Sequence, residues 1–158
     1  MKVVKPHIAI VTDIGNQHLL SFKNQNNILK EKIKLIESLN NEGLGIINND
    51  NDLLKNYDYK NKRILRYGIN NQSDVMAKNV EISSDYSKFD LYIKDKFIKR
   101  VRINLLSYHN VENVLCAICV CLSLNLEIEN ILKNIKNIGF IEHRLEKRII
   151  DGIEVIDD

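Results

Sequence analysis

The segment that decides the fold lies near the amino end and reads Lys5-Pro6-His7-Ile8-Ala9-Ile10-Val11-Thr12-Asp13-Ile14-Gly15-Asn16-Gln17-His18-Leu19. Residues 8–12 are a short apolar run after a proline, which is typical of a strand buried on both faces of a parallel sheet. Residues 13–18 read as the loop after that strand. The segment therefore predicts a layered α/β fold with a loop at the carboxyl end of a buried strand.

A helix and a second strand are expected next. Apolar residues recur at helical spacing and Gly43 ends the pattern, so a helix is predicted over roughly 25–40, with its buried face formed by Ile28, Leu35, Ile36 and Leu39. Residues 44–48 form a second short apolar run. A strand, helix and strand in this order imply a parallel crossover.

The pattern changes from Arg63 to Leu105, where apolar residues alternate with polar ones. This period of two predicts a hairpin through Asp95-Lys96. Two helices follow, one from near His109 and one over residues 128–135, and two short strands joined at Asp151-Gly152 close the chain. The fold class expected is α/β, a mostly parallel sheet with helices and an antiparallel excursion.

Composition favours one domain and excludes some partners. The 158 residues are 44% hydrophobic, enough for one core. The net charge of +2 comes from 23 basic and 21 acidic residues mixed along the chain, so a nucleic-acid partner or an RNA-binding domain is not expected. We find neither a run of about 18 apolar residues nor a signal peptide, and we expect no membrane span.

The three cysteines, Cys116, Cys119 and Cys121, lie within one apolar stretch. Their odd number argues against a secreted disulfide framework and favours a reducing cytoplasm. The spacing of Cys116 and Cys119 is Cys-x-x-Cys, but zinc needs about four ligands and the sequence has no second pair. We therefore interpret them as small buried hydrophobic residues.

The opening segment, with Lys32 on the following helix, resembles the Mur ligases, and most closely their D-Ala-D-Ala-adding branch. There a Lys-Pro strand ends in Thr-x-Ile-Gly-x-Gln/Ala-His-Leu. The resemblance implies that His18 binds magnesium and that Lys32 is carbamylated, which turns an ammonium into a carboxylate equivalent able to face a hard cation. Without the resemblance, the ordinary interpretation holds: a histidine after a strand is usually structural, and a lysine on a polar helix face is usually solvated.

Two later segments resemble the same family. His109-Asn110-Val111-Glu112-Asn113 is similar to its His-Asn-x-x-Asn helix start, which implies that Asn113 reads the adenine of ATP, while Asn110 either joins it or caps the helix. His143-Arg144-Leu145-Glu146 and the final Ile156-Asp157-Asp158 are similar to two further segments. They imply that Arg144 contacts phosphate and Asp158 the ribose. Without the resemblance, Arg144 and Asp158 would each be interpreted as an ordinary surface residue.

Some family features are absent or altered. The sequence holds no Gly-Lys-Thr phosphate loop, so residues 1–158 are expected to be a partial central ATP-binding domain that lacks this loop and the N-terminal and C-terminal domains. Asp13, Lys34 and Ser107 replace the common Asn, acidic residue and Gly of the family pattern. We expect the missing parts to come from a split ligase, or the gene to be truncated or decaying.

The resemblance implies an ATP- and Mg²⁺-dependent ligase of peptidoglycan synthesis. The complete enzyme would phosphorylate UDP-MurNAc-tripeptide and join it to D-Ala-D-Ala through an acyl phosphate, with Lys32, His18 and Arg144 as its catalytic residues. The chain alone is expected to be inactive. Two alternatives remain open: a non-catalytic remnant or nucleotide-binding partner module, and a sibling Mur or folylpolyglutamate-type ligase.

Overall fold

The computed structural model describes residues 6–15, 24–138, 146–150 and 153–157, with side chains in the first two ranges. The helices and strands, in chain order, are β1 (Ile8–Val11), α2 (Gln25–Glu37), β2 (Leu44–Asn48), α3 (Asp52–Lys55), β3 (Arg63–Gly68), β4 (Val75–Ile82), β5 (Ser87–Ile93), β6 (Lys96–Ile103), α4 (Tyr108–Ser123), α5 (Ile128–Ile135), β7 (Glu146–Ile150) and β8 (Ile153–Asp157).

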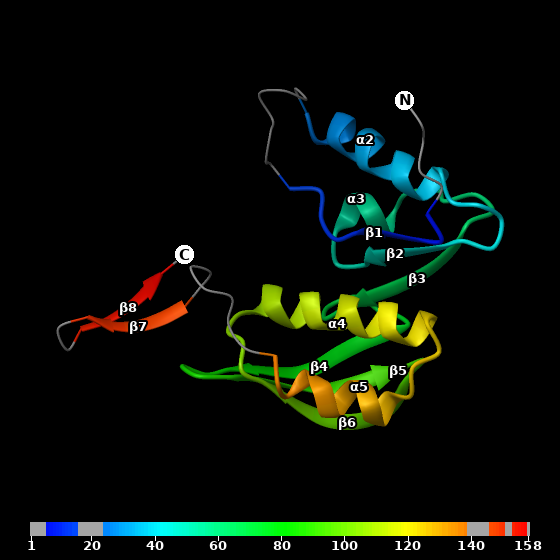
Figure 1. The fold of residues 1–158 in the computed structure, drawn as a ribbon. Helices are drawn as coiled ribbons and strands as arrows, with labels where there is room; N and C mark the ends of the chain where they lie inside the picture. The colour runs from blue at the N-terminus through cyan, green and yellow to red at the C-terminus, as the bar shows by residue number, and fades with distance from the viewer. Residues whose placement is uncertain (1–5, 16–23, 139–145, 151–152, 158) are drawn as a thin grey trace.

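Six strands form one sheet in the order β1-β2-β3-β4-β5-β6 (Figure 1). Neighbours from β1 to β4 are parallel, whereas β4-β5 and β5-β6 are antiparallel. The predicted parallel sheet with an antiparallel excursion is therefore confirmed. The alternation after residue 63 does not reveal that β3 still belongs to the parallel part. The short helix α3 also has no counterpart in the sequence prediction.

Helices cover both faces of the parallel strands. α2 and α3 pack over β1 and β2, and α4 packs on β2, β3 and β4, with α5 beside it (Figure 1). Ile46 and Ile47, adjacent on β2 and both fully buried, contribute to opposite cores. Successive side chains of a strand point to opposite faces, so an unbroken apolar run suits a strand covered on both sides.

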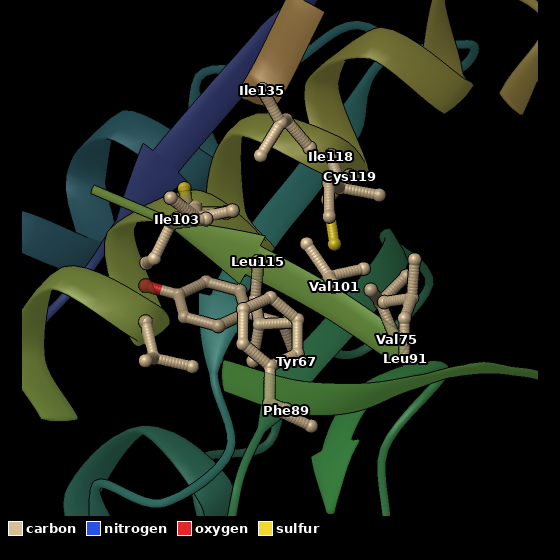
Figure 2. Packing of buried hydrophobic residues seen from close by; sticks show 14 of the residues in the cluster. Tyr67, Val75, Phe89, Leu91, Val101, Ile103, Leu115, Ile118, Cys119 and Ile135 are labelled. Carbon is tan, nitrogen blue, oxygen red and sulfur yellow. The ribbon is translucent and has the colours of Figure 1, made fainter. Parts of the chain in front are cut away.

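The larger core lies between α4, α5 and the sheet. Figure 2 shows Leu115 of α4 beside Phe89 of β5, and Ile118 of the same helix beside Cys119 and Ile135; Leu115, Ile118 and Phe89 are fully buried. Burial of each such side chain stabilises the fold by about 1.5–3 kcal/mol. Cys116 and Cys119 belong to the same core, which confirms their interpretation as small buried hydrophobic residues.

Helix α2 begins after Asn24, whose side-chain oxygen accepts a hydrogen bond of 2.9 Å from the backbone N–H of Asn27. It ends at residue 37, earlier than the predicted 40. Ile33 and Ile36 are buried, whereas Leu35 is 45% exposed. The assignment of Leu35 to the buried face is therefore wrong, because the face is centred on Ile33 and Ile36 and leaves Leu35 at its border.

The predicted hairpin and both later helices are confirmed. The turn between β5 and β6 consists of Lys94 and Asp95, one residue earlier than predicted, and both have positive φ, as a type I′ turn requires. The two predicted strands at the end of the chain, β7 and β8, pair antiparallel, with the connecting residues 151–152 outside the described part. They form a sheet of their own, which was not predicted. None of the described helices has the length and apolar character needed to cross a membrane.

Candidate functional site

Three parallel strands end at the same edge of the sheet. β1, β2 and β3 run in one direction, and the first turns of α4 approach the edge where they finish. Between them lies a cavity of about 180 Å³, here named the carboxyl-edge cavity, which is lined by Thr12, Asp13, Asn48, Asp50, Asn51, Tyr67, His109, Glu112 and Asn113. Open α/β sheets hold their ligands in a crevice at this position.

Asn48, the last residue of β2, fixes one wall of the carboxyl-edge cavity. Its side chain is 6% exposed and uses both ends of the amide: Nδ2 donates to Oε1 of Glu112 at 3.0 Å, and Oδ1 accepts from the backbone N–H of Asp50 at 2.9 Å. A buried amide with both ends satisfied is held in one orientation. Asn48 therefore ties the end of β2 to α4.

Asp50 organises the loop after β3. Its carboxylate accepts backbone N–H groups from Ile69, Asn70 and Asn71, with the shortest contacts at 2.5, 3.0 and 2.7 Å. Gly68 makes room for this arrangement, because a Cβ there would lie 3.0 Å from Oδ1 of Asp50. Charge-assisted bonds of this kind are stronger than neutral ones. The loop is therefore fixed beside the cavity.

Lys32 reaches the same edge from helix α2. Its Nζ donates to the backbone carbonyl of Asp13 at 2.8 Å, while the Asp13 carboxylate accepts from Nδ2 of Asn51 at 2.7 Å. Lys32 itself is exposed and does not line the cavity. The long side chain of Lys32 nevertheless brings its amine to the loop after β1, where the amine contacts Asp13, and Asp13 lines the cavity.

The start of α4 has a strained cap. Ser107 adopts φ 86° and ψ 152°, a region that is almost restricted to glycine, and its hydroxyl accepts from the backbone N–H of Asn110 at 3.4 Å. The Asn110 side chain donates back to the carbonyl of Leu106 at 2.6 Å. Asn110 thus serves the helix start in this structure, and it does not line the cavity.

Asn113 lies one turn further along α4 and lines the cavity with His109 and Glu112. Within residues 6–15 and 24–138, no side chain or backbone group bonds to its carboxamide, so both its donor and its acceptor are open to a ligand. The Nδ1 of His109 lies 3.7 Å from Oε2 of Glu112, longer than a hydrogen bond.

The carboxyl-edge cavity is lined by three acidic side chains. These are Asp13, Asp50 and Glu112, and none of the lining residues within 6–15 and 24–138 is a lysine or arginine. Phosphate groups are repelled by neighbouring carboxylates. The cavity therefore suits a neutral polar group, such as a nucleobase or a sugar, better than a phosphate.

Tyr67 lines the cavity and also belongs to the larger core. Burial, followed by the neighbouring Cys116, raises the pKa of its phenol. Burial likewise raises the pKa of the Cys116 and Cys119 thiols, with the hydrogen bond to Tyr67 acting in the opposite direction at Cys116. These groups remain protonated at neutral pH, so the thiols are poor nucleophiles.

Of the site residues predicted from sequence, Lys32, Asn110 and Asn113 lie in the described structure at one edge of the sheet, as given above. His18, Arg144 and Asp158 lie outside the described residues, so their roles stay predictions. In the described part, no three His, Cys, Asp or Glu side chains gather in an arrangement able to hold a metal ion.

Sequence reasoning missed several residues of the cavity. A polar run directly follows the strand predicted to be parallel to β1, and it contains Asn48, Asp50 and Asn51. Because parallel sheets bind ligands at the carboxyl ends of their strands, this position indicates a site. Tyr67 and Glu112 had no comparable signal, because their places depend on the third parallel strand and on how α4 packs.

Comparison with known proteins gives a consistent family. Residues 1–121 match the family described as the Mur ligase middle domain. A UDP-N-acetylmuramate–L-alanine ligase from Desulfatibacillum aliphaticivorans is 31% identical over 157 residues, which cover 98% of this chain and 34% of that protein. A UDP-N-acetylmuramoyl-tripeptide–D-alanyl-D-alanine ligase from Buchnera aphidicola is 28% identical over 147 residues, covering 92% and 32%. The chain spans about a third of the length of these relatives.

Solved structures share the fold. The MurF crystal structure from Acinetobacter baumannii has a TM-score of 0.86 and 25% identity, covering 98% of this chain and 34% of that one. The MurF ligase from Thermotoga maritima, solved in complex with ADP, has a TM-score of 0.85 and 16% identity, covering 97% and 35%. The second likeness shows the fold alone.

Proposed function

This chain belongs to the Mur ligase family, and from that premise we propose that it forms part of the ATP-binding middle domain of a peptidoglycan-precursor ligase. The observation that carries the proposal is the carboxyl-edge cavity, where the carboxamide of Asn113, which bonds to no group within residues 6–15 and 24–138, lines a space bounded by three parallel strands. Mur ligases use ATP, and this edge is where an open α/β sheet would hold it.

Within the family we propose the branch that adds D-Ala-D-Ala to UDP-MurNAc-tripeptide. The Gln17-His18-Leu19 step of the sequence and the similarity to MurF structures support it. The second candidate is the branch that adds L-alanine to UDP-N-acetylmuramate, which is favoured by the 31% identity to such a ligase. In either branch a carboxylate would be activated as an acyl phosphate and attacked by an amine.

Each part of the nucleotide has a proposed partner. The carboxamide of Asn113 would read adenine, since it offers a donor and an acceptor. The ribose would contact Asp158 and the phosphates Arg144, whose planar fork of donors suits oxyanions. Because the carboxylates of the carboxyl-edge cavity repel phosphate, the nucleoside would occupy the cavity and the phosphates would point away from it.

Magnesium would be held by His18 and by a carbamate on Lys32. The position of the Lys32 amine fits this role, because it lies 2.8 Å from the backbone carbonyl of Asp13, at the edge where the proposed nucleotide site lies. A carbamate there would present oxygens to a hard cation. Bound magnesium would neutralise charge on the transferring phosphoryl group.

The proposed reaction also requires a phosphate-binding loop and the substrate and C-terminal domains. We propose that this chain supplies the nucleoside side of the site, while those parts belong to other segments of the same ligase or to a partner chain. A non-catalytic nucleotide-binding module is the alternative, and it would share the same cavity.

Nucleotide binding tests the proposal. Calorimetric titration with ADP would compare the unsubstituted chain, Asn113→Ala, and a matched control, Asn61→Ala, in the exposed turn before β3. We expect Asn113→Ala to weaken binding by roughly tenfold or more, as expected when a base loses its bidentate partner. The control should bind as the unsubstituted chain does. Equal ADP affinity in all three proteins would contradict the proposal.

A further inference from the structure

Glu112 is held in the wall of the carboxyl-edge cavity, and one of its carboxylate oxygens accepts no hydrogen bond from residues 6–15 and 24–138. Oε1 accepts the hydrogen bond from Asn48 at 3.0 Å, and its side chain is only 23% exposed. Oε2 has no hydrogen-bond donor among the described residues, since His109 Nδ1 stays 3.7 Å away. The carboxylate is therefore oriented by one oxygen while the other can accept from a ligand.

The neighbouring Asn113 cannot distinguish one purine from another by itself. A carboxamide carries both a donor and an acceptor and can rotate by half a turn, so it can match a 6-amino or a 6-oxo edge. An ionised carboxylate only accepts. Glu112 and Asn113 are adjacent on α4 and line the same cavity, so a base bound by one lies beside the other.

We propose that Glu112 is a specificity-determining residue that accepts a hydrogen bond from the exocyclic amine of adenine and rejects 6-oxopurines. This inference rests on the proposed nucleotide site. A 6-oxo group would place an oxygen lone pair against a carboxylate and leave both unpaired, the kind of mismatch that gives strong discrimination. Asn48 is the positioning residue, because its bond fixes the carboxylate.

The test measures binding of adenosine diphosphate and inosine diphosphate, which differ at the 6 position, to the full chain. The unsubstituted chain should bind adenosine diphosphate at least about tenfold more tightly. Glu112→Gln should reduce this preference to within about threefold, because an amide can donate to the 6-oxo group. The matched control Glu129→Gln, on the exposed face of α5, should keep the full preference.

The outcomes separate this inference from the proposed function. Equal binding of the two diphosphates by the unsubstituted chain, or an undiminished preference in Glu112→Gln, overturns the role of Glu112. If the role of Glu112 is overturned but Asn113→Ala still weakens binding of adenosine diphosphate, the proposed nucleotide site is retained without a role for Glu112. Failure of the unsubstituted chain to bind either diphosphate overturns both. A thermal unfolding curve for each variant shows that the proteins compared are folded.

Discussion

The side-chain amide of Asn48 donates a 3.0 Å hydrogen bond to the carboxylate of Glu112, joining residues that are 64 positions apart in the sequence. The bond connects the end of a parallel strand with the second turn of the helix that lies over it. It shapes the carboxyl-edge cavity and gives the most direct stability test of the described site.

Asn48→Asp should destabilise the fold by about 2 kcal/mol, because a second buried carboxylate would face Glu112 and lose the donor. Chemical denaturation at neutral pH measures the change. The double variant Asn48→Asp with Glu112→Gln restores one donor and one acceptor in reversed order. It should recover more than half of the loss, and no recovery would show that the two side chains are not coupled.

Ser107→Gly should raise the free energy of unfolding by about 1 kcal/mol. Glycine adopts φ 86° without steric cost, and this gain exceeds the loss of a weak 3.4 Å cap. Ser107→Ala is the matched control, because it keeps the Cβ and loses the hydroxyl, and it should lower the stability instead. The midpoints of thermal unfolding of both variants measure the effect. A lower midpoint for Ser107→Gly than for the unsubstituted chain would show that the backbone of Ser107 is not strained.

Asp50→Ala should release the loop after β3, because three backbone N–H groups lose their acceptor. The expected cost is about 2–3 kcal/mol. Hydrogen exchange should accelerate specifically at Ile69, Asn70 and Asn71. The exposed Asp52→Asn change on α3 serves as control and should leave these amides protected. Unchanged protection in Asp50→Ala would show that other contacts hold the loop.

Tyr67→Phe should reduce the loss of stability at alkaline pH. Burial raises the pKa of the Tyr67 phenol above its unfolded value of about 10, so its contribution is complete below that pH and is lost as the pH rises above it. Urea unfolding at pH of about 7 and about 11 measures the difference. We expect the free energy of unfolding to decrease less between these pH values for Tyr67→Phe than for the unsubstituted chain. An equal decrease would show that other groups cause the loss of stability at alkaline pH.

The fold was largely predictable because its signals are local. The apolar run at residues 8–12, the turn residue Asp95 and the apolar spacing on α4 each specify an element without reference to distant parts. Leu35 was misassigned because a helix has a continuous range of orientations and only packing selects the buried arc. The helix α3 has a single turn, too short for a periodic signal.

The site was predictable only in part. Asn113 could be found because its motif is local to one helix start. The partnership of Asn48 with Glu112 could not, since it depends on which strand end the helix crosses. The same holds for Asp50, whose three donors come from a loop after the next strand. Tertiary contacts of this kind leave no period in the sequence.

The proposed function depends on binding of the ATP nucleoside in the carboxyl-edge cavity. Backbone amide chemical shifts of the full chain, recorded by NMR while adenosine diphosphate is added, locate the bound nucleotide residue by residue. We expect saturable shifts at Thr12 and Asp13, at residues 48–51 and at residues 109–113. Shifts confined to the basic groove of β6 and α5, lined by Lys99, Arg102, Lys133 and Lys136, would contradict it, because they would indicate only attraction of the phosphates to surface charge.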